Sequence, residues 1–580
     1  MAEKTGAEIF VETLKREEVE IVFGYPGGAV IDLYDQLYDT DIRKILPHHE
    51  QGGVHAADGY ARSTGNVGVC IATSGPGATN LVTGLATAHM DSVPIVAFTG
   101  QVPTSLIGTD GFQEADIKGI TMPITKHNYL VESIEELPRI LKEAFYLARS
   151  GRPGPVLVDL PKDVQQASTS YYYPEEVDLP TYRPNYAGNK RQIDTAADVI
   201  NRAERPMIYA GGGVIISGAS EEVTELAEKA SIPVTTTLTG IGCFDERSEL
   251  SLGMPGMHGE TEANLAFMET DLVIALGARF DDRVTGDVDN FAPEAEIIHV
   301  DIDPAEIGKI INADIPIVGD VKRVLKLLNP QIEENTHEDW LEQIEEWREI
   351  DTIEKTSEDL ISPRTIMEEL DDLTDGDVLM TTEVGQHQMW AAQFFNFTRP
   401  RSLMTSGGLG TMGYGFPAAL GVQAGNPDRT VVCIAGDGSM QMNIQELATA
   451  AKNNLPVKVL IFNNQYLGMV RQWQELFYEK RYSSTCLRRR DDCPKECEGP
   501  GSKVETEKCP EFIPDFVQVA RGYDIEAQMV TVAEEIRPAL KKALEHDGPY
   551  VLDFRIEREE NVFPMVAPGG SLNNMMLGEE

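Results

Sequence analysis

TVVCIAGDGS at residues 430–439 and VKVLIFNN at residues 457–464 are the two stretches that decide the fold. Each is an apolar, strand-like run that ends in polar residues. The 27 positions from Asp437 to Asn464 hold one helix and one strand, which is the length of a crossover between parallel strands. We therefore expect both polar ends at the carboxyl edge of one sheet, where ligands bind in open α/β folds.

These polar ends have the chemistry of a cation and phosphate site. The Asp437 carboxylate, the Asn464 amide oxygen and a nearby backbone carbonyl are hard oxygen ligands suited to Mg²⁺. Gly436 and Gly438 would let the backbone approach a phosphate closely. GDGS alone also occurs in ordinary turns, but GDGS with NN at crossover spacing favours a functional site.

Outward from this stretch, strands alternate with helices along the whole chain of 580 residues. This pattern predicts an α/β fold of three domains, each with a central parallel sheet flanked by helices. We place the domains at 1–167, 191–330 and 360–580. Residues 168–190, rich in Tyr and Pro, should form a surface linker, and the acidic stretch 333–358 a solvated connecting helix. Domains one and three share one order of strand, Gly turn and helix, which predicts two similar folds flanking a different one.

The charge balance is unusual, with 94 acidic against 49 basic residues and a formal net charge of −45. It argues against nucleic acid and against an anionic membrane surface as partners. It suggests a cytoplasm with molar salt, as in halophilic archaea, because salt screens self-repulsion. The alternative is an acidic mesophile protein with a solvated surface. We expect no membrane span, no signal peptide and a cytoplasmic location.

The seven cysteines are unevenly placed. Cys70, Cys243 and Cys433 lie in apolar or Gly-rich runs and should be reduced thiols in or near the core. The other four crowd into residues 486–509, namely Cys486, Cys493, Cys497 and Cys509. Their spacing is loose for a zinc site, so zinc binding, disulfides and free thiols in a disordered segment stay open.

Two further stretches are candidates for chemistry. Glu50, in HHEQGGVHAADGYAR at 48–62, follows an apolar stretch and precedes two glycines; it could be a catalytic acid, a surface glutamate or part of a metal cluster with His48, His49 and His55. The run Gly211–Gly213 ends a strand, as a dinucleotide site requires. No intact G-x-G-x-x-G is present, so the residues support only a nucleotide-site hypothesis.

Over nearly its whole length the chain resembles the acetolactate synthases (acetohydroxyacid synthases), a branch of the thiamine diphosphate (ThDP) enzymes. The likeness rests on the GDGS and NN stretches and on FGYPGGAV, GQVPTSLIGTDGFQEAD, SGRPGPVLVDLPKDV, LGARFDDRVTG, GQHQMWAAQ, GGLGTMGYGFPAALG and IFNNQYLGMVRQWQE. It implies ThDP with Mg²⁺ held by Asp437, Asn464 and the main-chain oxygen of Tyr466. Glu50 would then hydrogen-bond N1′ of the ThDP aminopyrimidine.

The resemblance assigns further roles by position. Gln113 and Lys126 would line the substrate approach as catalytic residues, and Met469 and Trp473 would wall the acceptor pocket. Met412 would hold the bent cofactor. The remaining ThDP contacts would be Val384, Gly385, Gln386, His387, Gly410, Gly436, Gly438, Ser439 and Met469.

The middle domain of this family carries a flavin, FAD, without net redox chemistry. The resemblance places its contacts over His258–Arg279 and Asp301–Asp320, with Arg152 reaching across. By residue they are Arg152, Gly211, Gly212, Gly213, His258, Gly277, Arg279, Asp281, Arg283, Asp301, Ile302 and Asp320.

The implied reaction is decarboxylation of pyruvate and transfer of the two-carbon unit to a second 2-oxo acid. Pyruvate as acceptor gives 2-acetolactate and 2-oxobutanoate gives 2-aceto-2-hydroxybutanoate, early steps toward valine, leucine and isoleucine. The resemblance also implies a homodimer or a dimer of dimers, and a small regulatory subunit is common in the family. Alternatives are another ThDP and flavin enzyme, such as pyruvate oxidase or a different 2-oxo acid carboligase, or a catalytically silent homologue that serves as a binding or assembly subunit.

Overall fold

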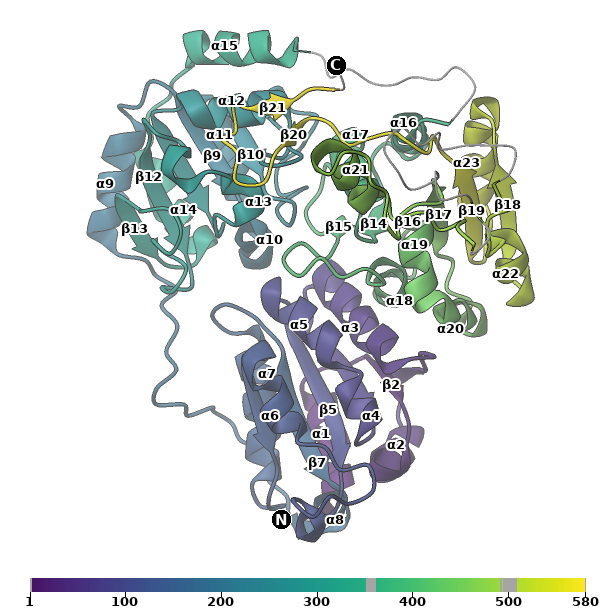
Figure 1. The fold of residues 1–580 in the computed structure, drawn as a ribbon. Coiled ribbons are helices and arrows are strands. Elements are labelled where there is room, and N and C mark those ends of the chain that lie inside the picture. The colour runs from purple at the N-terminus through teal and green to yellow at the C-terminus, as the bar shows by residue number, and fades with distance from the viewer. Residues whose placement is uncertain (1–2, 351–360, 491–492, 494–508, 579–580) are drawn as a thin grey trace.

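Three α/β domains follow one another in the computed structural model, which describes residues 3–350, 361–490, 493 and 509–578 (Figure 1). Each domain has a parallel sheet flanked by helices, which confirms the predicted fold class. The predicted linker at 168–190 runs between the first two domains, and Tyr182 in it packs against the core of the first domain.

In the described chain, the first domain holds a six-stranded sheet in the order β3-β2-β4-β5-β7-β6. Its strands are β2 (Ile21–Tyr25), β3 (Arg43–Ile45), β4 (Gly68–Ala72), β5 (Ile95–Gln101), β6 (His127–Leu130) and β7 (Val156–Pro161). Its helices include α1 (Gly6–Arg16), α2 (Ile31–Tyr38), α3 (Glu50–Thr64), α5 (Val82–Met90) and α7 (Leu137–Arg149).

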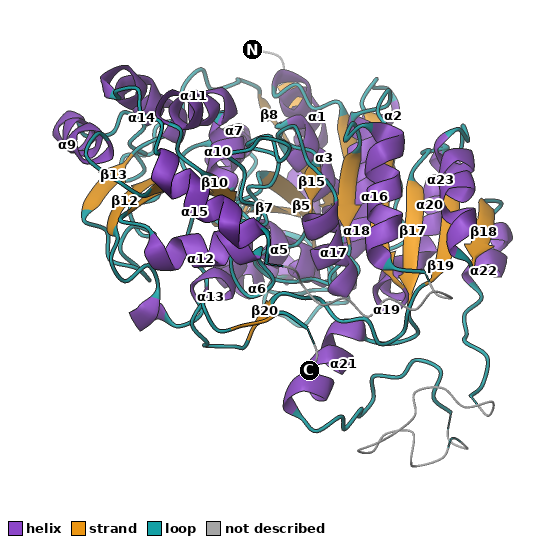
Figure 2. Ribbon diagram, turned by 90° about the horizontal axis from the view of Figure 1, so that it is seen from above, coloured by secondary structure: helices purple, strands orange, loops and turns teal. Residues whose placement is uncertain are grey.

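The third domain repeats this topology, with six described strands in the order β15-β14-β16-β17-β19-β18. They are β14 (Leu379–Thr382), β15 (Leu403–Met404), β16 (Val431–Gly436), β17 (Lys458–Asn463), β18 (Glu526–Val530) and β19 (Tyr550–Arg555). One apolar cluster covers the sheet with α18 (Gly415–Gly425), α20 (Leu447–Asn453) and α22 (Phe516–Gly522). A second covers the other face with α16 (Pro363–Thr374), α17 (Gln386–Phe394) and α23 (Ile536–Leu544), which lie above the strands in Figure 1 and therefore toward the viewer in Figure 2. In both domains the strand order reverses between the first and third strands, which creates a crevice at that point.

The middle domain has a different order, β10-β9-β11-β12-β13, over the residues described. Its strands are β9 (Pro206–Ala210), β10 (Val234–Thr236), β11 (Leu272–Leu276), β12 (Glu296–Asp301) and β13 (Ile315–Val318). Its helices include α9 (Lys190–Ile200), α10 (Gly212–Ser217), α11 (Ser220–Ala230), α12 (Thr261–Glu269), α13 (Asp282–Thr285) and α14 (Val321–Leu328). The order reverses between β9 and β11, so the turn after β9 is the expected ligand position.

The first and third domains share one hydrophobic core, because α3 and α18 cross at close range. A Cβ on Gly59 would overlap the Ala418 carbonyl, and a Cβ on Gly421 would overlap the Ala56 carbonyl. Glycine at both crossing positions therefore lets the two backbones touch.

The acidic stretch 333–358 departs from its prediction. It forms α15 (Glu338–Arg348), but Trp340 and Ile344 are buried against the middle domain, and Trp340 Nε1 donates to the Pro206 carbonyl at 3.1 Å. The helix is therefore amphipathic and docked rather than solvated all round. Residues 351–360 of the stretch lie outside the described residues.

Two antiparallel ribbons join distant parts of the chain. β1 (Glu3–Thr5) pairs with β8 (Ser168–Ser170), so the chain enters and leaves the first domain side by side. β20 (Met565–Val566) pairs with β21 (Met575–Met576) in a segment that crosses from the third domain onto the middle one, drawn in yellow in Figure 1. Among the helices that the structure describes, none has both the length and the apolarity needed to cross a bilayer.

Candidate functional site

A pocket opens at the carboxyl ends of β14, β16 and β17, at the crevice of the third domain. The start of α21 (Gly468–Phe477) closes one side of it. The structure brings together here most of the residues predicted for ThDP and Mg²⁺: Val384, Gly385, Gln386, His387, Met412, Gly436, Asp437, Gly438, Ser439, Asn464, Tyr466 and Met469.

Asp437 and Asn464 give the pocket the chemistry of a cation site. Asp437 is 1% exposed, its Oδ2 has no hydrogen-bond partner among the described residues, and burial raises the pKa of its carboxyl to about 8. Asn464 points its Nδ2 at Gln386 Oε1, 3.2 Å away. A buried carboxylate with a free oxygen is stabilised by a bound cation, so the donor set fits Mg²⁺.

The glycines of the pocket make room for a ligand with a close backbone approach. A Cβ on Gly436 would lie 2.8 Å from the His387 ring. His387 is buried, which lowers the pKa of its imidazole to about 3, and its Nε2 has no described partner. The space beside Gly436, which a Cβ would fill, and the unpaired His387 Nε2 fit a bound diphosphate group.

The loop that carries Met412 is held by two carboxylates from opposite sides. Glu383 accepts the Gly413 N–H at 2.6 Å and the Phe416 N–H at 3.1 Å, and burial raises the pKa of this carboxyl to about 7. Asp91 of the first domain accepts the N–H groups of Gly407 and Gly408 at 3.0 and 2.7 Å. Met412 is thus presented to the pocket on a loop anchored at both ends.

Two other residues predicted near this pocket do not line it. Gly410 lies in the same loop, in the left-handed region with φ +69°. Trp473 lies one turn after Met469 on α21 and packs edge-on against Phe477, with the ring centroids 5.9 Å apart.

Glu50 belongs to a second group of residues, on the first domain. It is the first residue of α3, and its Oε2 accepts a hydrogen bond from Asn80 Nδ2 at 2.9 Å. Gly77 lies beside it, since a Cβ there would be 3.3 Å from Glu50 Oε1. Every residue that lines the Asp437 pocket comes from the third domain. One described chain therefore presents two separate half-sites.

The histidines around Glu50 do not form a metal cluster. His55 is fully buried and packs edge-on against Tyr414, and His48 Nδ1 contacts Thr449 Oγ1 at 2.9 Å. The described residues contain no group of three side chains placed to bind a metal through His, Cys, Asp or Glu. This result removes that alternative for the part of the chain that the structure covers.

Gln113 and Lys126 have different surroundings. Gln113 is exposed in the loop beside Gly75, near the Glu50 half-site. Lys126 Nζ lies 2.5–2.8 Å from four oxygens, the carbonyls of Leu147, Ser150 and Arg152 and the Tyr182 hydroxyl, and its three N–H groups are shared among them. Burial lowers the pKa of Lys126 to about 7. These four oxygens occupy its ammonium group, and its contact with substrate stays a prediction.

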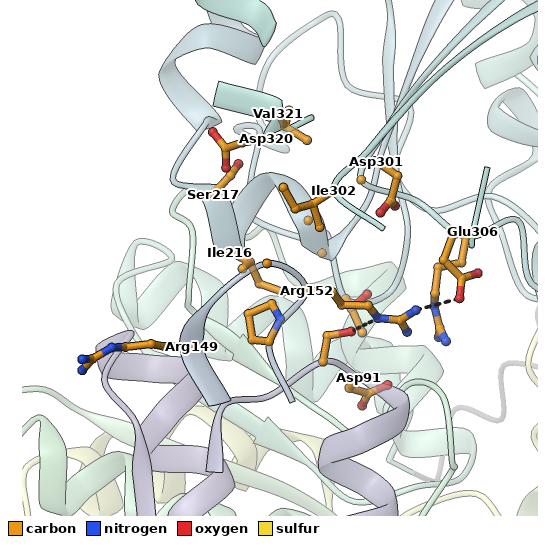
Figure 3. Close-up of a pocket in the computed structure, with 18 of the residues that line it drawn as sticks. Asp91, Arg149, Arg152, Ile216, Ser217, Asp301, Ile302, Glu306, Asp320 and Val321 are labelled. Carbon is orange, nitrogen blue, oxygen red and sulfur yellow. Dashed lines mark hydrogen bonds and ion pairs between the residues drawn. The ribbon is translucent and has the colours of Figure 1, made fainter. Parts of the chain in front are cut away.

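A cavity of about 290 Å³ lies between the first and middle domains, at the reversal of strand order in the middle sheet (Figure 3). Arg152 reaches into it from the first domain, paired with Glu306 at 2.6 Å and bonded to Ser92 Oγ at 2.8 Å. Gly211 and Gly277 pack backbone to backbone at its floor. The position at the switch point of the middle sheet and the glycine turns fit a dinucleotide.

Most residues predicted for FAD line this cavity, namely Arg152, Gly212, Gly213, Gly277, Arg279, Asp301, Ile302 and Asp320. Four do not. Gly211 lies beneath the glycine turn, and His258 is buried elsewhere, near Gln393. Asp281 caps α13 and Arg283 is mostly exposed on that helix.

The sequence reasoning missed the first domain's share of the cavity, which includes Met90, Asp91, Ser92 and Arg149. Met90 ends α5, Asp91 and Ser92 follow it, and Arg149 ends α7. No phosphate-binding pattern marks these residues. Their position beside Arg152, which the resemblance had assigned, is the signal that could have found them.

Three cysteines lie in the core as reduced thiols, as predicted. Cys70, Cys243 and Cys433 are buried free thiols. Cys486 pairs through its backbone with Tyr466, which places the start of the cysteine-rich stretch 486–509 at the Asp437 pocket. Cys486 and Cys493 are free thiols, whereas Cys497 lies outside the described residues, so the question of zinc or disulfides stays open.

Comparisons with known proteins agree with this geometry. Residues 4–120, 193–328 and 383–554 match the N-terminal TPP binding domain, the central domain and the C-terminal TPP binding domain of the thiamine pyrophosphate enzymes. The acetolactate synthase large subunit of Corynebacterium glutamicum is 51% identical over 98% of this chain and 89% of its own. The probable large subunit of Methanocaldococcus jannaschii is 50% identical over 98% and 95%, and the acetolactate synthase of Arthrospira platensis 51% over 99% and 97%. The chain belongs to the acetolactate synthase family of thiamine diphosphate enzymes.

Proposed function

We propose that this chain is the catalytic subunit of an acetolactate synthase. It would decarboxylate pyruvate and transfer the two-carbon unit to pyruvate or 2-oxobutanoate, in the formation of branched-chain amino acids. The observation that carries the proposal is the pocket that joins Asp437, Asn464, Met412 and Met469 in a chain about half identical to acetolactate synthases along its length.

Some residues of the pocket would bind the cation and others the diphosphate. Asp437, Asn464 and the Tyr466 main-chain oxygen would hold Mg²⁺, and the Gly436–Gly438 turn and the start of α17 would hold the diphosphate. When bound, ThDP supplies a nucleophilic carbon at C2 of its thiazolium ring. Glu50 would hold a proton at N1′ of the aminopyrimidine, and Gln113 would donate to a developing oxyanion.

The separation of Glu50 from the Asp437 pocket supports a homodimer as the smallest active unit. Glu50 of one chain would complete the pocket of the other. Exposed apolar side chains occur beside both half-sites, including Phe112 near Gln113 and Val470 near Met469. Burying these side chains against a second copy would favour association. Relatives that are named large subunits support a small regulatory subunit as partner. A dimer of dimers stays a prediction.

The interdomain cavity would hold FAD without net redox chemistry. Arg152, Ser92 and the Gly212–Gly213 turn would contact its phosphates and ribose, with Asp301 and Asp320 nearby. The net charge of −45 supports a cytoplasm with molar salt and a halophilic archaeal source.

The test is an assay of the purified protein with pyruvate, ThDP, Mg²⁺ and FAD in molar KCl. Acetolactate formed without oxygen uptake is the expected result. Oxygen-dependent formation of acetyl phosphate would overturn the proposal in favour of a pyruvate oxidase, and no turnover with all cofactors bound would favour a silent homologue.

A further inference from the structure

A chain of buried amide side chains leads from the cation pocket to the C-terminal segment. Asn464 Nδ2 donates to Gln386 Oε1 at 3.2 Å, Gln386 Nε2 donates to Gln472 Oε1 at 2.9 Å, and Gln472 Nε2 donates to the Val562 carbonyl at 3.0 Å. Asn464, Gln386 and Gln472 are 5%, 3% and 0% exposed. Since water is excluded, each amide depends on its protein partners.

The backbone at the far end fixes the direction of every amide in this chain. The Val562 N–H donates to Gln472 Oε1 at 2.8 Å while the Val562 carbonyl accepts from Gln472 Nε2, and a peptide group cannot exchange these roles. The Glu560 carbonyl likewise accepts from Gln386 Nε2 at 2.9 Å. Gln386 must therefore present Oε1 to Asn464.

Asn464 has only one orientation left. Its Nδ2 faces Gln386 Oε1, so its Oδ1 turns away, where it accepts the Tyr466 N–H at 3.1 Å. The reverse orientation would oppose two oxygens and would turn an NH₂ group toward a cation. An amide that ligates Mg²⁺ must present its oxygen.

The backbone at Gly468 leaves room for the contact between Gln386 and Asn464. A Cβ on Gly468 would overlap Gln386 Oε1 and lie 2.8 Å from Asn464 Nδ2. Glycine at 468 therefore leaves the space in which these two amides meet.

We propose that Gln472, held by the peptide groups of residues 560–562, is a positioning residue that directs the oxygen of Asn464 toward Mg²⁺ through Gln386. The inference rests on the proposed function, because it takes Asn464 as a metal ligand. It also assigns the Gln386 side chain to the cation site, since both of its N–H groups are used by Gln472 and Glu560 and only its backbone N–H remains for a diphosphate.

The experiment compares Gln472→Met, which keeps size but has no hydrogen-bonding amide, with Gln472→Glu, which keeps the acceptor for Gln386 and, protonated in this fully buried site, a donor for the Val562 carbonyl. The readout is Mg²⁺ binding by calorimetry at saturating ThDP, with FAD binding and Tm measured in parallel. Loss of an outer partner of a metal ligand costs about 10–100-fold in metal affinity. We expect that loss for Gln472→Met, with a value near wild type for Gln472→Glu and FAD affinity unchanged in both.

Gln423→Met is the matched control, because Gln423 is equally buried in the third domain but bonds the carbonyls of Asn426 and Arg429 at the end of α18. Wild-type Mg²⁺ affinity in Gln472→Met, or an equal loss of Mg²⁺ and FAD affinity, would overturn the inference. If Gln472→Met does not fold, Gly468→Ala tests the same contact and should show the same selective loss. A wild-type protein that binds neither Mg²⁺ nor ThDP would instead overturn the proposed function.

Discussion

Glu50 is the residue on which the cofactor chemistry depends most. Its carboxyl lies at the start of α3 with one described hydrogen bond, from Asn80, which leaves an oxygen for a ring nitrogen. Glu50→Gln should slow exchange of the ThDP C2 proton about 100-fold or more, because an amide cannot hold the proton that the carboxyl shares. NMR of C2–H exchange measures the effect.

Glu20→Gln is the control, since Glu20 is exposed in the same domain. Both variants should keep the wild-type circular dichroism. Wild-type exchange in Glu50→Gln would refute the role given to this residue.

Residues whose side chains would bind a ligand directly could be predicted from the sequence. Residues that act on the ligand only through another side chain could not. Asp437 and Asn464 end apolar strands at crossover spacing, so their meeting follows from topology. Gln472 lies within a helix and depends on Val562, 90 positions later. Such a contact is set by tertiary packing, for which a single sequence has no local pattern.

At the scale of elements, the crossing of α3 and α18 fixes the first domain on the third. Gly421→Ala should lower the free energy of unfolding by about 1–3 kcal/mol, since the new methyl overlaps the Ala56 carbonyl on another helix. This cost exceeds the gain in helix propensity of about 1 kcal/mol. Chemical denaturation followed by circular dichroism gives the difference.

Gly522→Ala in α22 is the matched substitution, because a Cβ there meets no atom within 4 Å. It should be neutral or stabilising. Equal stability of the two variants would show that the crossing tolerates a methyl group.

The central strands β16 and β17 were predicted because they are buried apolar runs that end in polar residues. The edge strand β18 was not, because its burial alternates along the strand and it carries exposed residues such as Glu526. A strand that is buried on one face alone has no continuous apolar run, so it is harder to recognise in the sequence.

At the scale of the molecule, a partly buried glutamate joins the middle and third domains. Glu246 accepts the Phe397 N–H at 2.7 Å, and burial raises the pKa of its carboxyl to about 8. The folded state therefore holds this proton more tightly than the unfolded chain, and stability falls as the pH rises from about 4.5 through about 8. The slope is at most about 1.4 kcal/mol per pH unit for one group.

Glu246→Gln should flatten this part of the pH dependence of Tm, measured by calorimetry between pH 5 and 9. Glu249→Gln, at an exposed position nearby, should keep the wild-type slope. Equal slopes in the two variants would contradict the account of Glu246.

The acid excess leads to a prediction for the whole chain. With a net charge of −45, raising KCl from 0.1 to 2 M should increase Tm, because salt screens self-repulsion. Sucrose at equal osmolality should give a smaller rise, since it strengthens burial without screening charge. An equal response to KCl and sucrose would favour the alternative of an acidic mesophile protein.

The small ribbon of β1 and β8 has a consequence for the history of such chains. β1 and β8 pair, so the first and last segments of the first domain lie side by side. The backbone therefore continues from this domain to the others at one place, although its side chains share a core with the third domain. A gene segment that encodes such a unit could be duplicated or inserted into another gene without disrupting the fold of the protein that receives it. The same strand order in the first and third domains is what an ancient copying of one unit would leave behind.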